Sequence, residues 1–260
     1  MTVSPLREPE SFTSEDPSAI LRPARWSAIA QRMVYFGHQS VGSDVCAGIQ
    51  ELATDYALPL TVVQTREPQS VTGPAFVSFL AGRHRDYASK NAAILRLLES
   101  STRARNPLVL LKYCYGDISS PREYTIVFDA YRDTVDTIQF EHPDVALVHT
   151  TIPLTTVEGG FKARTKRYLG RTTRRDVAVA RHRYNELLRA EFGGFEPIFD
   201  LAQIQATTPD GTVSGFTSDG HRIETLAVEN TNSGTDLSAR CRRVAAEALL
   251  DVLATVIEAS

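Results

Sequence analysis

The sequence predicts an α/β fold built on a doubly wound parallel sheet. Short apolar runs alternate along the chain with longer stretches of helical periodicity, the order typical of parallel strands joined by crossover helices. Three of the runs come shortly after a proline, and a proline suits the entry of a strand. The predicted strands are Met33–Phe36, Leu60–Val63, Leu108–Tyr113, Val145–Val148 and Pro197–Leu201.

Helices are expected between and after these strands. In the last one, Val244, Leu249, Val252 and Val256 share one face, and most charged residues lie opposite. The predicted helices are Val41–Tyr56, Tyr87–Ser100, Glu123–Phe140, Arg174–Glu191 and Leu237–Ile257.

A small β-hairpin is expected as an insertion before the last helix. The Asp-Gly pairs at 210–211 and 219–220 flank Val213–Thr217, an alternating run, and Asp-Gly between such runs is a strong turn signal. His221 follows the second pair, so Asp219 and His221 could instead form an acid–histidine pair. The turn is the favoured interpretation.

Composition limits the classes of function. The chain has 260 residues, of which 42% are hydrophobic and 23% charged, and this composition supports a sizeable core. We expect residues 1–24, rich in Pro, Ser and Glu, to be a flexible arm, and residues 25–260 to form a single domain. The net charge of -3 gives no signature of nucleic-acid or membrane binding. The expected partner is a small-molecule substrate, and the sequence does not fix the oligomeric state.

Cysteine usage and motifs bear on location and cofactors. Cys46, Cys114 and Cys241 lie far apart without CxxC spacing. This favours a reducing compartment, so we expect a cytoplasmic protein without a disulfide framework or a zinc site. No cofactor is expected, because the sequence has no GxGxxG, no phosphate-binding loop and no metal-ligand spacing.

The strongest functional signal lies in Met33–Gly42. An apolar run stops at Gly37, a polar triplet ending in Ser40 follows, and a helix-like stretch comes next. Such a strand–turn–helix elbow points a side chain at helix N–H groups that suit an oxyanion or an anionic substrate group. Ser40 is therefore a candidate nucleophile. The alternative is that Ser40 only caps the following helix.

His38 lies two residues before Ser40. In an extended segment both side chains would point to the same side, so His38 could act as a base or as an oxyanion donor. The alternative is a structural histidine bonded to the backbone.

Two further segments are expected near this elbow, because ligands of such sheets bind beyond the carboxyl ends of the strands. These segments are Tyr113–Asp117 and His149–Thr151. Asp117 could orient a histidine or a substrate group, or it could cap the helix near Pro121. His149 could face the site or form only its wall.

The stretch from Phe161 to Arg189 is strongly basic and includes Lys162 and Arg167. It could be a lid that recruits an acidic or phosphorylated substrate. It could also be a solvated loop and helix face, which is the usual meaning of a charge run.

With these blocks placed, the chain resembles the SGNH (GDSL-like) hydrolase superfamily. More narrowly, it resembles bacterial members whose first block reads Gly-His-Gln-Ser-Val-Gly. The resemblance runs from about Met33 to the C-terminus. It implies a flavodoxin-like sheet and a serine that attacks an ester or related acyl group. The blocks that carry it, in order, are 37–42, 112–117, 149–154, 184–189 and 199–202.

The final block departs from the superfamily, which places its catalytic Asp and His in an Asp-x-x-His motif. In the corresponding stretch Ser233 occupies the aspartate position and Asp236 the histidine position, so the usual base is missing. The first block departs too, because Ser40 matches the serine of Gly-Asp-Ser only after a one-residue shift.

We therefore expect an ester hydrolase or acyl transferase with an atypical catalytic set. A displaced base, His38 or His221, would serve Ser40. Two alternatives stay open: a repurposed fold that performs non-hydrolytic acid–base chemistry on a small anionic substrate, and an inactive binding module. The expected catalytic residues are Ser40, His38, Asp117 and Asp236; those expected around the substrate are Gln39, Gly42, Tyr115, His149, Thr151, Lys162 and Arg167.

Overall fold

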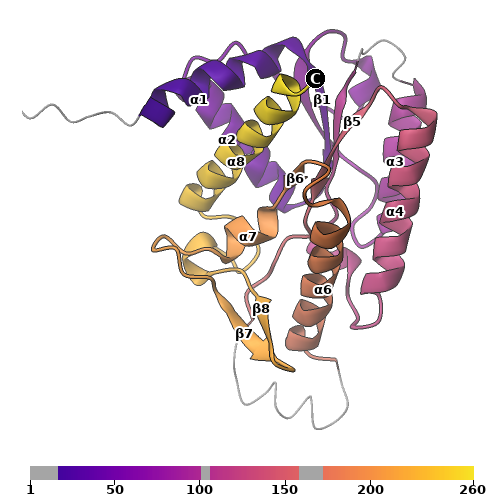
Figure 1. Cartoon of the computed structure of the whole chain (residues 1–260), viewed down its shortest axis with the longest axis vertical. Coiled ribbons are helices and arrows are strands. Elements are labelled where there is room, and N and C mark those ends of the chain that lie inside the picture. Colours follow the sequence, from indigo (N-terminus) through magenta and orange to yellow (C-terminus); the bar gives the residue numbers. More distant parts are fainter. Residues whose placement is uncertain (1–16, 101–105, 158–171) are drawn as a thin grey trace, which may run out of the picture.

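The computed structural model describes residues 17–100, 106–157 and 172–260. Its centre is a parallel sheet of six strands in the order β2-β3-β1-β4-β5-β6 (Figure 1). Without the edge strand β2, this order is that of a flavodoxin-like sheet. The strands are β1 (Met33–His38), β2 (Val62–Gln64), β3 (Ala75–Leu80), β4 (Leu108–Leu111), β5 (Ala146–Thr150) and β6 (Ile198–Phe199).

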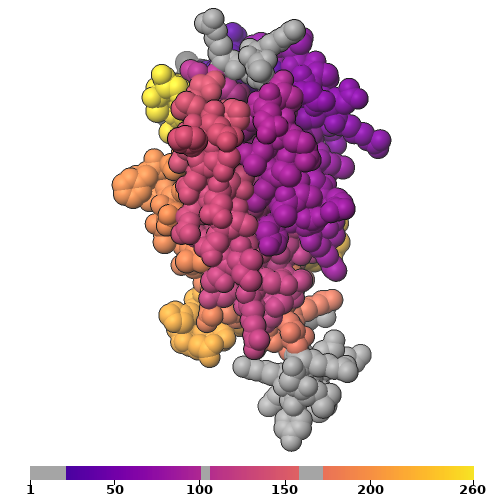
Figure 2. All heavy atoms as spheres, turned by 90° about the vertical axis from the view of Figure 1, so that its right-hand side faces the viewer, coloured from indigo at the N-terminus to yellow at the C-terminus, as the bar shows by residue number. Residues whose placement is uncertain are grey.

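Helices cover both faces of the sheet, so the predicted doubly wound α/β class is confirmed. One face carries α1 (Pro17–Ser27), α2 (Val41–Asp55) and α8 (Ala239–Glu258). The other carries α3 (Tyr87–Ser100), α4 (Tyr124–Glu141) and α6 (Arg174–Phe192). Figure 2 looks onto this second face, where side chains of α3 and α4 lie beside one another. Short helices complete the connections: η1 (Ala28–Gln31), η2 (Pro68–Ser70), η3 (Tyr115–Asp117), α7 (Leu201–Ala206) and η4 (Val228–Asn230).

Alternation along β1 decides which way the site residues face. Val34 and Phe36 belong to the core under α2 and α8, whereas Met33 and Tyr35 belong to the core under α3, α4 and α6. Successive side chains of a strand point to opposite faces. The last residue of β1, His38, therefore points to the α2 and α8 side.

The strand β3 was not predicted from the sequence. Its run is short, starts after Gly73-Pro74 and contains the polar Ser78, yet it is buried and pairs directly with β1. Pairing across the sheet overrode this weak local signal. A second difference concerns the expected arm, residues 1–24, because α1 begins within it and Arg22 pairs with Glu247 and Asp251 of α8.

The predicted hairpin is present as β7 (Gly215–Ser218) and β8 (His221–Glu224). Its turn is Asp219-Gly220, and both residues have positive φ, at 50° and 80°. This is the combination that a two-residue type I′ turn requires. The hairpin packs against α6.

Candidate functional site

Ser40 lies in the elbow between β1 and α2 and has a backbone conformation that side chains rarely adopt. Its φ is 47° and its ψ is -116°. Such a conformation costs on the order of 1–3 kcal/mol and concentrates at functional sites. The residue is exposed, and its hydroxyl makes no capping hydrogen bond to α2. The helix-cap interpretation therefore does not account for the Ser40 side chain, which is open to solvent.

Gly42 shapes the elbow. A Cβ atom at position 42 would lie 2.4 Å from the Cβ atom of His38, so a side chain here would force α2 away from β1. The N–H of Gly42 donates to the carbonyl of Gln39 at 3.2 Å. Gly42 was expected around the substrate, and the structure gives it a role in the close approach of two backbone segments.

His38 is held in the core below the elbow. Its Nε2 lies 2.8 Å from Oγ of Ser78 and 3.6 Å from Sγ of Cys46. Burial, with the charge of Lys112 as a lesser cause, lowers the pKa of His38 to about 3. His38 is therefore a structural histidine, neutral at ordinary pH, and not the base of Ser40. The prediction that both side chains share one side fails because the positive φ of Ser40 ends the extended alternation.

Gln39 fixes the neighbouring loop. Its amide Nε2 donates to the carbonyls of Ala81 at 3.1 Å and Gly82 at 2.9 Å, directly after β3. This ties the elbow to the loop after β3. The expected substrate-binding role of Gln39 is thereby replaced by a positioning role for its amide nitrogen.

Lys112 is a residue of the site that the sequence analysis missed. Its side chain is fully buried, and Nζ donates to the carbonyls of Gln39 at 3.1 Å and Tyr113 at 3.2 Å. It forms no ion pair with a carboxylate of the described residues. Burial lowers the pKa of Lys112 to about 8. The amine thus contacts the carbonyl of the residue directly before Ser40. The only available signal was a lysine continuing an otherwise apolar strand.

Asp117 is not free to orient a histidine or a substrate. Its carboxylate is buried and pairs with Nζ of Lys90 at 2.7 Å, while its second oxygen accepts from the N–H of Cys114 at 2.6 Å. Nζ of Lys90 also donates to the carbonyl of Arg83 at 2.8 Å. The buried pair therefore locks the loop after β3 to the loop after β4, and this is the role that the structure gives Asp117.

His149 and Thr151 also have structural roles. The ring of His149 faces α4 and α6, where Nδ1 lies 2.8 Å from the hydroxyl of Tyr131 and Nε2 lies 2.9 Å from a carboxylate oxygen of Glu196. Burial lowers the pKa of His149 and outweighs the opposing effect of Glu196. Thr151 is buried and accepts the N–H of Ala202, at 2.9 Å, at the start of α7. Neither side chain is available to a substrate at the elbow.

Tyr115 belongs to a cluster at the carboxyl ends of the strands. Its ring lies edge-on to the ring of His84, with centroids 6.1 Å apart, and the guanidinium of Arg181 lies 5.4 Å from its centroid. Nδ1 of His84 is 3.7 Å from Sγ of the buried Cys114. His84 escaped the sequence analysis because its loop follows the unpredicted strand β3.

Asp236 lies in the loop before α8, close to the first turn of α2. The N–H of its neighbour Leu237 donates to the carboxylate of Asp44 at 3.0 Å, and Asp44 lies one helical turn from Ser40. Asp236 is exposed and accepts from Oγ of Ser233 at 2.8 Å. Burial raises the pKa of Asp44, with the negative charge of Asp236 as a lesser contribution. Positions 233 and 236 are thus joined by a hydroxyl–carboxylate hydrogen bond.

Of the three expected residues that remain, the structure describes only His221. His221 is exposed on β8, beside α6, where its charge lowers the pKa of His182 as a minor cause. It makes no hydrogen bond or ion pair with Ser40. Lys162 and Arg167 lie outside the described residues.

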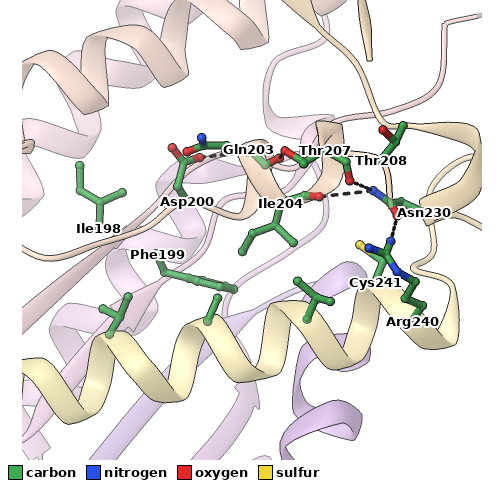
Figure 3. A pocket seen from close by; sticks show the side chains of 13 residues that line it. Ile198, Phe199, Asp200, Gln203, Ile204, Thr207, Thr208, Asn230, Arg240 and Cys241 are labelled. Atoms are coloured by element: carbon green, nitrogen blue, oxygen red, sulfur yellow. Dashed lines mark hydrogen bonds between the residues drawn. The ribbon is translucent and has the colours of Figure 1, made fainter. Parts of the chain in front are cut away.

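A separate hollow of about 400 Å³ lies at the β6 edge of the sheet, between α7 and α8 (Figure 3). Apolar side chains such as Phe199 and Ile204 lie along it, and Nη1 of Arg240 donates to Oδ1 of Asn230 at 3.2 Å at its polar end. None of the expected residues that the structure describes lines this hollow.

Among the described residues, no group of three or more His, Cys, Asp or Glu side chains is arranged to hold a metal ion. Within the same residues, no helix has both the length and the apolar character needed to cross a membrane.

Comparison with known proteins gives distant structural likenesses. No family model and no curated protein matches the sequence. One similar solved structure is a putative platelet activating factor from Streptococcus pneumoniae, with 10% identity and a TM-score of 0.48 over 90% of this chain and 92% of the other. Another is a GDSL-like lipase from Bacteroides thetaiotaomicron, with 9% identity and a TM-score of 0.48 over 88% of this chain and 89% of the other.

Proposed function

We propose that the protein is an acyl hydrolase or acyl transferase that uses Ser40 as its nucleophile. The observation that carries the proposal is the strained and exposed presentation of Ser40 between a buried strand and a helix N-terminus. Strain of this kind persists only where the surrounding structure enforces it, and Gly42 with Lys112 does so here. The resemblance of residues 37–42 to the SGNH nucleophile block supports the same role for Ser40.

In the proposed reaction Ser40 Oγ attacks the acyl carbon, and the N–H of Val41 at the start of α2 receives the developing oxyanion. The serine proton needs an acceptor, and we assign this role to the neutral amine of Lys112. Its pKa, lowered to about 8 by burial, suits a base that works slightly above neutral pH. Serine–lysine pairs are a known variant of the serine triad.

The resting arrangement holds Lys112 on the carbonyl of Gln39, and the amine is not bonded to the serine hydroxyl in the described structure. Catalytic hydrogen bonds are often long or misaligned before substrate binds, so this arrangement is compatible with the role. The acyl intermediate on Ser40 is then released to water or to a second alcohol or amine, which separates hydrolysis from transfer.

The repurposed-fold alternative assigned the acid–base work to His38, Asp117 and Asp236. His38 is bonded within the core, and Asp117 is neutralised by Lys90. That version therefore loses two of its three residues. The inactive binding module is the alternative that the following experiment has to exclude.

The experiment is hydrolysis of 4-nitrophenyl acetate by the natural chain, by Ser40→Ala and by Ser43→Ala. Ser43 is an exposed serine on the same turn of α2 and is the matched control. We expect Ser40→Ala to lose the activity, by ~1000-fold or more, and Ser43→Ala to keep it. Equal rates in all three proteins would leave a binding module as the better description.

A further inference from the structure

We propose that the substrate of the Ser40 site carries an anionic oxyacid group, a carboxylate or a phosphate, that binds the guanidinium of Arg181. The inference rests on the proposed function for its acyl-transfer part, and its anion-binding part stands on the observations below.

Arg181 is a buried cation without a counterion in the described part of the chain. The residue is 9% exposed, and no carboxylate of the described residues pairs with it. Its Nε donates to the carbonyl of Ile118 at 3.3 Å, and Nη1 donates to Oγ1 of Thr155 at 3.1 Å. A buried charge is costly unless it is paired. Neutral oxygens orient this guanidinium without neutralising it.

One end of the guanidinium is left for a ligand. Nη2 of Arg181 makes no hydrogen bond to the described residues, and Nη1 uses only one of its two protons, on Thr155. The ring of Tyr115 lies under the group and limits its movement. A planar donor pair held in this way matches the two oxygens of a carboxylate or a phosphate.

The position of Arg181 relates it to Ser40. Ile118 follows β4 and Thr155 follows β5, so the guanidinium lies at the carboxyl edge of the sheet, where the elbow is. A chain of contacts joins the two: Gln39 binds the loop after β3, and His84 of that loop packs on Tyr115. The anion would therefore sit across these loops from the attacked acyl group.

A second guanidinium lies near Arg181 at this edge. Arg85 lies against Gly116, close enough that its charge lowers the pKa of Arg181 as a minor cause, behind burial. Asp117, a carboxylate of the same loop, is already neutralised by Lys90. An anionic substrate group would supply the missing negative charge.

The first test compares two esters with the same leaving group, 4-nitrophenyl acetate and the mono-4-nitrophenyl ester of succinic acid. They are assayed with the natural chain, Arg181→Gln, Arg181→Lys and Arg183→Gln. Arg183 is the matched control, because it is exposed on the same helix and its guanidinium lies over another ring, that of Tyr124.

In Arg181→Gln we expect the ratio of kcat/KM for the anionic ester to that for the neutral ester to fall by ~10- to 100-fold, the size of one lost charge-assisted contact. Arg181→Lys should keep part of the ratio, and Arg183→Gln all of it. Equal losses on both esters in Arg181→Gln would show a purely structural arginine and overturn the inference.

The second test does not need catalysis. Binding of inorganic phosphate and of succinate is measured by calorimetry on Ser40→Ala and on Ser40→Ala with Arg181→Gln. Binding of either anion that disappears with Arg181 supports the site even if Ser40 proves not to be a nucleophile, and the preferred anion identifies the substrate group. Binding of neither anion to Ser40→Ala, or binding that is unchanged without Arg181, overturns the inference.

Discussion

The ammonium group of Lys112 donates a hydrogen bond to the backbone carbonyl of Gln39 over 3.1 Å, from a fully buried position. This contact holds the residue directly before Ser40. Burial of this amine also lowers the stability of the fold, because its partners among the described residues are neutral carbonyl oxygens. A chain selected only for stability has little reason to keep it, and this is why we connect Lys112 with Ser40 chemistry.

Replacing Lys112 with methionine should raise stability near neutral pH. The folded pKa of about 8 lies below the ordinary 10.5, so burial of the protonated amine penalises folding at pH values below about 8. We expect the free energy of unfolding, measured with urea at pH 7, to rise by ~1–3 kcal/mol. The difference should shrink as the pH rises toward 10.5, because the burial penalty in the natural chain is then relieved.

Lys90→Met is the matched control for Lys112→Met. Lys90 is equally buried but pairs with Asp117 at 2.7 Å, so its loss leaves an unpaired buried carboxylate and should cost ~3–5 kcal/mol. Destabilisation of similar size by both methionine substitutions would show that Lys112 is held as favourably as Lys90.

The rate of ester hydrolysis should follow the ionisation of Lys112. Only the neutral amine accepts the serine proton, so kcat/KM for a neutral ester should rise with pH and level off above about 8. The profile should show no step from His38, whose pKa is lowered to about 3. A midpoint in the ordinary histidine range would instead assign the base to a histidine.

Glycine at position 40 should be more stable than alanine. The φ of 47° and ψ of -116° burden any residue with a Cβ atom, and glycine removes that burden. We expect the free energy of unfolding of Ser40→Gly to exceed that of Ser40→Ala by ~1 kcal/mol in thermal or urea unfolding, and both variants to lack activity. Equal stabilities would mean that the elbow relaxes and is not enforced by its surroundings.

The last block should accept a conventional acid–histidine pair. Oγ of Ser233 already bonds the carboxylate of Asp236 at 2.8 Å, so Ser233→Asp with Asp236→His places the two new groups at hydrogen-bonding separation. We expect the double variant to raise hydrolysis near pH 7 by ~100-fold and to shift the pH midpoint toward that of histidine. Asp236→His alone should gain less, because no carboxylate at position 233 orients the new ring. No gain from the pair would indicate that position 236 does not reach Ser40.

Local sequence signals were enough for the elbow and the hairpin. The elbow was located by an apolar run that ends at Gly37 and is followed by Ser40 and a helical pattern. The turn of the hairpin was specified by Asp219-Gly220. Each of these features is formed by a few residues that are adjacent in the sequence. A local sequence pattern is therefore enough to predict its geometry.

The roles of single side chains at the site depended on information that the sequence does not hold locally. Lys112 was inside a recognised block, but its importance comes from the side of β4 on which it falls and from the carbonyl that it meets there. Asp117 was expected to be free because its partner, Lys90, lies on a distant helix. His84 went unnoticed because β3 was missed. Arg181 was one of many basic residues until its burial was known.

The activation of Ser40 as a nucleophile is tested most directly by its reaction with a fluorophosphonate above pH 8, followed by mass spectrometry of the peptides. We expect one adduct per chain, located on Ser40 and absent from Ser40→Ala, with Ser43 unmodified. We also expect strongly reduced labelling in the folded Lys112→Met variant. A folded natural chain that gains no adduct at Ser40 would contradict a nucleophilic role for this serine.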